Sequence, residues 1–92
     1  VARRRGIAVA IGSLAIRDPE AGADRLANRS ILLAPDGRIA ARYDKMHLFD
    51  VDLPNGDRYR ESASFLSGGR VQLADLAWGR LGLTICYDLR FP

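Results

Sequence analysis

The chain has 92 residues, 48% hydrophobic and 27% charged, a balance that is typical of a folded domain and excludes a disordered segment. No apolar run approaches the roughly 18 residues of a membrane span, so we expect no membrane partner. The net charge of +3 favours nucleic-acid binding only weakly, because the arginines are spread along the chain without a recognised binding motif. We therefore expect no nucleic-acid partner and keep such binding as a minor alternative. Cys86 is the only cysteine, which excludes an internal disulfide and is typical of a cytoplasmic protein.

The first part of the chain is predicted to be the end of a helix followed by a buried strand. Residues 2–6 place three arginines in a last helical turn, before a glycine that stops the helix. Residues 7–16 are nearly all apolar or small, which predicts a strand buried on both faces. Residues 17–24 include Pro19 and Gly22 and are predicted to form a loop.

A β-hairpin is predicted next, with strands at residues 26–34 and 38–43. The turn between them reads Pro-Asp-Gly. Proline fixes φ, the aspartate side chain bonds the backbone, and glycine accepts a positive φ. Alternating apolar and polar residues in the second strand support the hairpin.

A long connection and a second hairpin follow. Residues 44–65 are too many for an unstructured connection inside a compact domain, and their aromatic side chains argue against disorder, so we expect a functional loop. Residues 71–76 and 81–85 are predicted to pair as a hairpin. Cys86 follows directly, and the carboxyl end of a buried strand is where α/β folds place ligands.

Three side chains near these predicted strand ends suggest covalent catalysis: Lys45, which is the only lysine, Glu61 and Cys86. A thiolate is a nucleophile, an ammonium stabilises an oxyanion, and a carboxylate holds the lysine or moves protons. The backbone N–H of Tyr87 is a candidate second oxyanion donor. The alternatives are a buried apolar cysteine and a solvated Lys45–Glu61 pair. His47 lacks partners at metal-ligand spacing, so we expect no metal.

Three stretches of the sequence surround Lys45, Glu61 and Cys86. Residues 43–50 read Tyr-Asp-Lys-Met-His-Leu-Phe-Asp, residues 59–62 read Tyr-Arg-Glu-Ser, and residues 82–92 read Gly-Leu-Thr-Ile-Cys-Tyr-Asp-Leu-Arg-Phe-Pro. In this order they resemble the lysine motif, the loop with a second glutamate and the nucleophile motif of the nitrilase, or carbon–nitrogen hydrolase, superfamily. Two segments look most like the amidase branch that acts on small ω-amides or deaminated glutathione: residues 45–52, Lys-Met-His-Leu-Phe-Asp-Val-Asp, and residues 86–92, Cys-Tyr-Asp-Leu-Arg-Phe-Pro.

The resemblance implies an α/β fold, part of a four-layer α-β-β-α sandwich that usually pairs into dimers. It implies hydrolysis of a small-molecule amide to carboxylate and ammonia through a cysteine thioester. Cys86 would be the nucleophile, Lys45 would stabilise the oxyanion, and Glu61 would position Lys45 and the substrate. No metal or organic cofactor is implied.

One departure concerns the general-base glutamate, which in the family precedes the lysine motif. Glu20 is the only glutamate before Lys45 and lies in the wrong context, so we do not assign it and expect the base upstream of Val1. Because Phe91-Pro92 stands where a helix should begin, we expect residues 1–92 to be a partial carbon–nitrogen hydrolase domain, incomplete at both ends and inactive alone. The competing hypothesis is a non-catalytic relative that binds a small amide or a protein partner.

Overall fold

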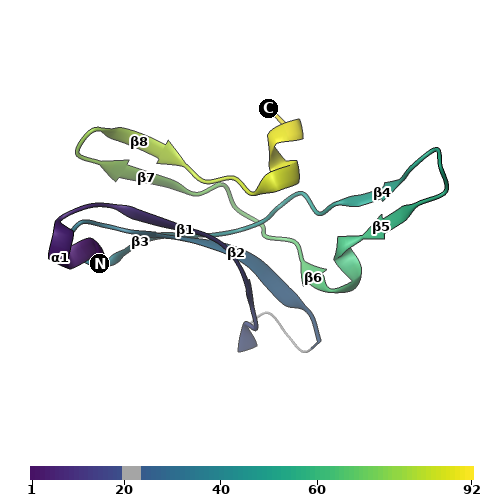
Figure 1. Cartoon of the computed structure of the whole chain (residues 1–92), viewed down its shortest axis with the longest axis horizontal. Coiled ribbons are helices and arrows are strands. Elements are labelled where there is room, and N and C mark those ends of the chain that lie inside the picture. Colours follow the sequence, from purple (N-terminus) through teal and green to yellow (C-terminus); the bar gives the residue numbers. More distant parts are fainter. Residues whose placement is uncertain (20–23) are drawn as a thin grey trace.

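A four-stranded sheet forms the centre of the chain in the computed structural model, which describes residues 1–19 and 24–92 (Figure 1). Its strands are β1 (Val9–Ile16), β2 (Leu26–Leu33), β3 (Ile39–Asp44) and the short β6 (Phe65–Leu66). The order is β1-β2-β3, all antiparallel, and β6 pairs in parallel with β2. The loop predicted at residues 17–24 lies partly outside the described residues, and Glu20 lies wholly outside them.

The β2–β3 hairpin confirms the prediction for this region. Gly37 N–H donates to the Ala34 carbonyl at 2.8 Å, and the Asp36 carboxylate accepts the Arg38 N–H at 2.9 Å. Gly37 adopts φ 89°, which a residue with a Cβ rarely adopts. The Pro-Asp-Gly chemistry therefore fixes the turn and, with it, the pairing of the two strands.

Two smaller hairpins extend from the sheet toward opposite ends of the molecule (Figure 1). One joins β7 (Leu73–Leu76) to β8 (Gly79–Gly82), close to the prediction. The other joins β4 (Asp50–Asp52) to β5 (Arg58–Arg60) within the connection that was expected to be a loop. Strands of three residues are too short for an alternating pattern to reveal them.

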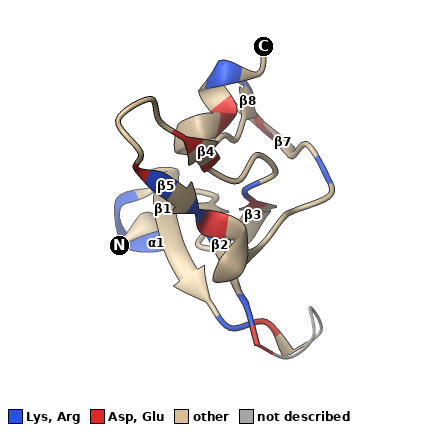
Figure 2. Ribbon diagram, turned by 90° about the vertical axis from the view of Figure 1, so that its right-hand side faces the viewer, with Lys and Arg blue, Asp and Glu red and all other residues tan. Residues whose placement is uncertain are grey.

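Three short helices complete the described residues: α1 (Ala2–Arg5) and two 3-10 helices, Glu61–Ala63 and Cys86–Arg90. The end of α1 matches its prediction, because its last turn is basic and Gly6 takes the left-handed conformation that terminates helices. No described helix is long and apolar enough to cross a membrane. Figure 2 shows basic residues both in α1 and at the C-terminal end, in agreement with the scatter of arginines along the sequence.

The hydrophobic core is small and lies where the β7–β8 hairpin packs against β3. Leu32 is the most deeply buried side chain, 1% exposed. The other members of the core come from β3, β7 and the segment before Cys86: Ala41, Tyr43, Ala74, Leu83 and Ile85. Because Leu83 and Ile85 belong to this core, the chain reaches Cys86 from a fixed direction.

Two predictions about strands are wrong. The β1 strand is not buried on both faces: its positions are half-buried or exposed, and Leu14 is 40% exposed. The burial of a strand's faces depends on the layers that pack against the sheet, and an apolar run carries no information about those layers. The strand before Cys86 ends at Gly82, not Ile85, because the amide of Ile85 bonds the side chain of Asp88 instead of a neighbouring strand.

The described part of the chain is rich in sheet. The two helical layers of the predicted sandwich are not represented there and stay a prediction.

Candidate active site

Lys45 follows β3 directly and is almost completely buried, with 2% exposure. Its backbone N–H donates to the Asn28 carbonyl at 2.9 Å, which fixes the main chain beside β2. Its Nζ lies 2.6 Å from Glu61 Oε2. The Lys45 and Glu61 side chains are only 3% and 15% exposed, so the alternative of a solvated surface pair is wrong.

Glu61 begins a 3-10 helix and accepts hydrogen bonds from three residues. Besides Lys45, the Phe49 N–H donates to Oε2 at 2.7 Å and the Asn28 amide donates to Oε1 at 3.4 Å. Burial alone raises the pKa of Glu61, but the bonds from Lys45, Phe49 and Asn28 outweigh it and the pKa is lowered. Glu61 is therefore ionised near neutral pH and suited to hold Lys45 in place.

Cys86 is exposed, and its backbone has φ 49°, a value that residues with a side chain rarely adopt. Such a conformation costs about 1–3 kcal/mol and persists only where the surroundings enforce it. Because the residue is exposed, the alternative of a buried apolar cysteine is wrong. Tyr87 is the second residue of the 3-10 helix that begins at Cys86, and N–H groups in a first helical turn lack intrahelical acceptors.

One pocket brings the three predicted side chains together. Lys45, Glu61 and Cys86 line a cavity of about 490 Å³, a size that suits a small molecule. The remaining lining residues come from β1, β2, the β4–β5 region and the segment before Cys86: Ser13, Asn28, Phe49, Tyr59, Arg60 and Ile85. The pocket thus offers a thiol, an ammonium and a carboxylate to one small ligand.

Aromatic rings form a continuous row beside Cys86. Tyr59 packs against Phe49, Phe49 against Tyr87, and Tyr87 against Phe91, with centroid distances of 5.4, 5.0 and 5.3 Å. His47 stacks on Phe91 at 3.9 Å. These contacts join the long connection to the C-terminal 3-10 helix, so the row supports the wall of the pocket on the side of Phe49.

Sequence reasoning missed two residues of this site. Asn28 bonds Glu61, and nothing in the sequence around β2 marks it. Asp88 accepts bonds from both the lysine segment and the nucleophile segment, yet within the motif it shows only as one polar residue among several. His47, whose role was left open, lies with Nδ1 2.7 Å from Asp88 Oδ1.

Comparison with known proteins agrees with this arrangement. The family model for carbon-nitrogen hydrolases matches residues 1–92, and the chain belongs to that family. A deaminated glutathione amidase of Yersinia enterocolitica is 44% identical over all of this chain and 32% of its own length. The omega-amidase NIT3 of Saccharomyces cerevisiae is 40% identical over 88% of this chain and 27% of its own length. The predicted resemblance to the amidase branch is thus confirmed.

Solved structures support the fold. The C. elegans NitFhit protein superposes on 98% of this chain with a TM-score of 0.82 and 38% identity, and the match covers 22% of that protein. Saccharomyces cerevisiae Nit3, described as a member of branch 10 of the nitrilase superfamily, gives a TM-score of 0.79 with 30% identity, over 98% of this chain and 29% of Nit3. The chain therefore adopts part of the nitrilase fold and spans about a third or less of these relatives.

Proposed function

We propose that the protein hydrolyses the carbon–nitrogen bond of a small-molecule amide, with Cys86 as nucleophile and Lys45 as oxyanion stabiliser. The observation that carries this proposal is the pocket in which a buried lysine, held by a carboxylate, shares a wall with an exposed cysteine. A buried ammonium is a strong electrostatic group because little water screens it. The membership of the carbon-nitrogen hydrolase family supports the same reaction.

The first half of the reaction forms a thioester. The Cys86 sulfur attacks the amide carbon, and the carbonyl oxygen becomes an oxyanion within reach of Lys45 Nζ and the Tyr87 N–H. When the tetrahedral intermediate collapses, the carbon–nitrogen bond breaks. The nitrogen leaves as ammonia after it takes up the proton that the Cys86 thiol gave to the general base. Glu61 acts by keeping Lys45 pointed into the pocket.

The second half consumes water. A water molecule attacks the thioester carbon, the carbon–sulfur bond breaks, and the carboxylate leaves while the thiol is regenerated. A general base is needed for both halves. Because both Glu61 oxygens already accept hydrogen bonds, we do not assign that role to Glu61.

The relatives suggest the substrate class. Those named deaminated glutathione amidase and omega-amidase point to a terminal amide on a small carboxylic acid. We propose such an amide as the substrate, and the family resemblance leads us to propose a cytoplasmic homodimer as the working form.

The test replaces Cys86 in the full-length protein and measures ammonia release from a panel of small ω-amides and deaminated glutathione. Cys86→Ala should abolish release from every substrate, and wild type should show the acyl-enzyme by intact mass. Thr84→Ala is the matched control, because Thr84 is exposed two residues away and should leave turnover unchanged. Turnover retained by Cys86→Ala would overturn the proposal.

A second candidate is binding without turnover. It is favoured by one observation: both oxygens of Glu61 accept hydrogen bonds, so Glu61 is engaged as the partner of Lys45 and is not free to move protons. A non-catalytic relative would bind a small amide measurably by calorimetry and release no ammonia from it. Ammonia release that depends on Cys86 would exclude this candidate.

A further inference from the structure

A buried carboxylate that takes no part in the proposed steps lies next to the nucleophile, Cys86, and bonds the residue before it. Asp88 is 4% exposed and lies two residues after Cys86 in the same 3-10 helix. Its Oδ2 accepts the Ile85 N–H at 2.9 Å, and its own N–H donates to the Ile85 carbonyl at 3.1 Å. These two bonds close a ring around Cys86 and Tyr87. They fix the chain on both sides of the residue whose φ is 49°.

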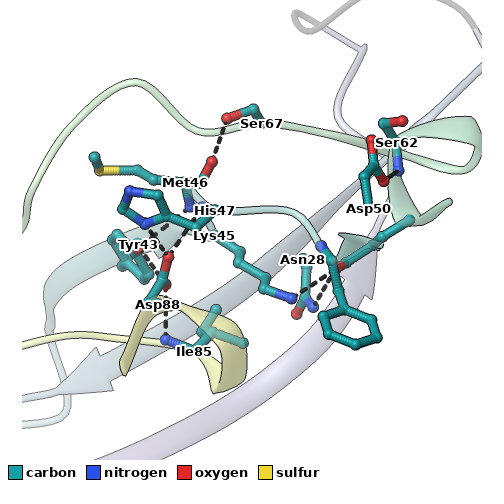
Figure 3. Close-up of polar contacts among 12 residues, drawn as sticks. Asn28, Tyr43, Lys45, Met46, His47, Asp50, Ser62, Ser67, Ile85 and Asp88 are labelled. Carbon is teal, nitrogen blue, oxygen red and sulfur yellow. Dashed lines mark hydrogen bonds and ion pairs between the residues drawn. The ribbon is translucent and has the colours of Figure 1, made fainter. Parts of the chain in front are cut away.

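The same carboxylate holds the lysine segment. The Tyr43 hydroxyl donates to Asp88 Oδ2, and the His47 N–H donates to Asp88 Oδ1 at 2.9 Å (Figure 3). Tyr43 and His47 lie two residues before and two residues after Lys45, so Asp88 bonds a side-chain hydroxyl on one side of the lysine and a main-chain amide on the other. The Tyr43 hydroxyl also accepts the Met46 N–H at 3.2 Å, which tightens the same segment.

Asp88 has no free site with which to serve a substrate. A carboxylate offers about four lone-pair positions. Three donors, from Ile85, Tyr43 and the His47 amide, and the His47 ring nitrogen at 2.7 Å surround its two oxygens. Burial raises the pKa of Asp88, but the bonds from Tyr43, Ile85 and His47 outweigh it and lower the pKa. The group therefore acts as a fixed anion and not as a proton acceptor.

We propose that Asp88 is a positioning residue for amide hydrolysis, which holds the Cys86 corner in register with Lys45. The inference rests on the proposed function for its kinetic readout. Lys45 and Cys86 come from segments 41 residues apart, and Asp88 bonds both segments directly. Loss of that link lets the corner relax from its strained conformation, which moves the thiol away from the ammonium.

The first test is Asp88→Asn in the full-length protein, with Asp75→Asn as the control. An amide nitrogen cannot accept a hydrogen bond, so the substitution leaves one pair of donors without an acceptor and keeps the volume. We expect kcat to fall about 100-fold, the order that follows from a misplacement of about 1 Å, with a much smaller change in KM. Asp75 is an exposed residue of β7, and its variant should keep both constants.

The second test measures the rate at which iodoacetamide alkylates Cys86 at one fixed pH, followed on the peptide that carries it. Asp88 holds the backbone before Cys86, so the thiol should change its position and its alkylation rate in Asp88→Asn. Asp75→Asn should be alkylated at the wild-type rate. A wild-type rate in folded Asp88→Asn overturns the proposal.

Tyr43→Phe keeps the test decisive if Asp88→Asn does not fold, because it preserves the carboxylate and removes one donor. We expect a smaller fall in kcat and a smaller change of the alkylation rate than in Asp88→Asn. A lower melting temperature with unchanged kcat and unchanged alkylation in either folded variant would show a structural role alone and overturn the proposal. Alkylation needs no turnover, so a changed alkylation rate in a protein that hydrolyses no amide would contradict the proposed function and leave the role of Asp88 intact.

Discussion

The Lys45–Glu61 pair and the Arg80–Asp75 pair have nearly equal lengths, 2.6 and 2.7 Å, in very different surroundings. The side chains of the first pair are 3% and 15% exposed, and those of the second are 65% and 74% exposed. Exposed pairs contribute about 0–1 kcal/mol because water screens them, whereas removing one partner of a buried pair costs about 3–5 kcal/mol. The two ion pairs therefore differ in the burial of their side chains and not in the distance between their charged atoms.

The largest expected effect comes from removing the buried cation. Lys45→Met in the full-length protein should lower kcat about 100- to 1,000-fold, the loss seen when an oxyanion donor is deleted, and should leave Glu61 as an uncompensated buried charge. Ammonia release measures the change. Arg80→Met is the control from the exposed pair and should keep wild-type kcat. An equal loss of kcat in the two variants would contradict the claim that burial gives the Lys45–Glu61 pair its importance.

A glycine beside Lys45 gives the next largest effect. A Cβ on Gly68 would lie 2.1 Å from the Asp44 carbonyl oxygen, so Gly68→Ala forces the backbone apart and should destabilise the protein by about 1–3 kcal/mol. The Gly68 N–H also donates to the Lys45 carbonyl at 2.9 Å, so the same strain reaches the site. Gly69→Ala is the matched control, because a Cβ there meets nothing within 4 Å. Denaturant unfolding that finds the two variants equally stable would contradict this prediction.

The pH dependence of the free energy of unfolding tests how much the buried carboxylates contribute to stability. Glu61 and Asp88 have pKa values below their ordinary 4.5 and 3.8 in the folded chain, so each binds protons less readily there than when unfolded. Their contribution to stability is therefore fully present above about pH 5 and is lost as the pH falls through the folded pKa values. Thermal unfolding between pH 6 and pH 2 should show a flatter dependence for Glu61→Gln than for wild type. If the melting temperatures of the two proteins fell equally with pH, the predicted contribution of Glu61 would be contradicted.

The smallest effect is expected on the exposed hairpin. Asp75→Asn removes the ion pair with Arg80, both side chains of which are more than half exposed. The free energy of unfolding should change by no more than about 0.5 kcal/mol, and added salt should abolish even that difference. Chemical denaturation at low and high ionic strength measures it. A loss of about 2 kcal/mol or more is on the scale of buried groups. It would show that exposure does not determine how much these ion pairs contribute to the free energy of unfolding.

Local sequence chemistry predicted the parts of the fold that depend on neighbouring residues. The Pro-Asp-Gly turn gave the β2–β3 hairpin, and a basic turn followed by Gly6 gave the end of α1. The burial of β1 could not be predicted, since an apolar run does not state what covers it. The β4–β5 hairpin escaped because three-residue strands carry no period.

The residues of the candidate site also fall into two groups, those that the sequence predicted and those that it missed. Motif resemblance singled out Lys45, Glu61 and Cys86, and the structure places all three around one pocket. Asn28 escaped notice because its link to Glu61 spans 33 positions, and Asp88 because its bonds to Tyr43 and His47 span 45 and 41. Contacts at such separations leave no mark on local composition or periodicity.

The sequence by itself determined which groups are available: one thiol, one ammonium and short turns that set the strands beside them. Only the tertiary structure decided their surroundings, because burial and hydrogen bonding depend on segments distant in the chain. It buried Lys45 against Glu61, left Cys86 exposed at a strained corner, and put Asp88 between the two segments. A charged group removed from water must find its partners nearby, and those partners come from wherever the fold brings the chain back.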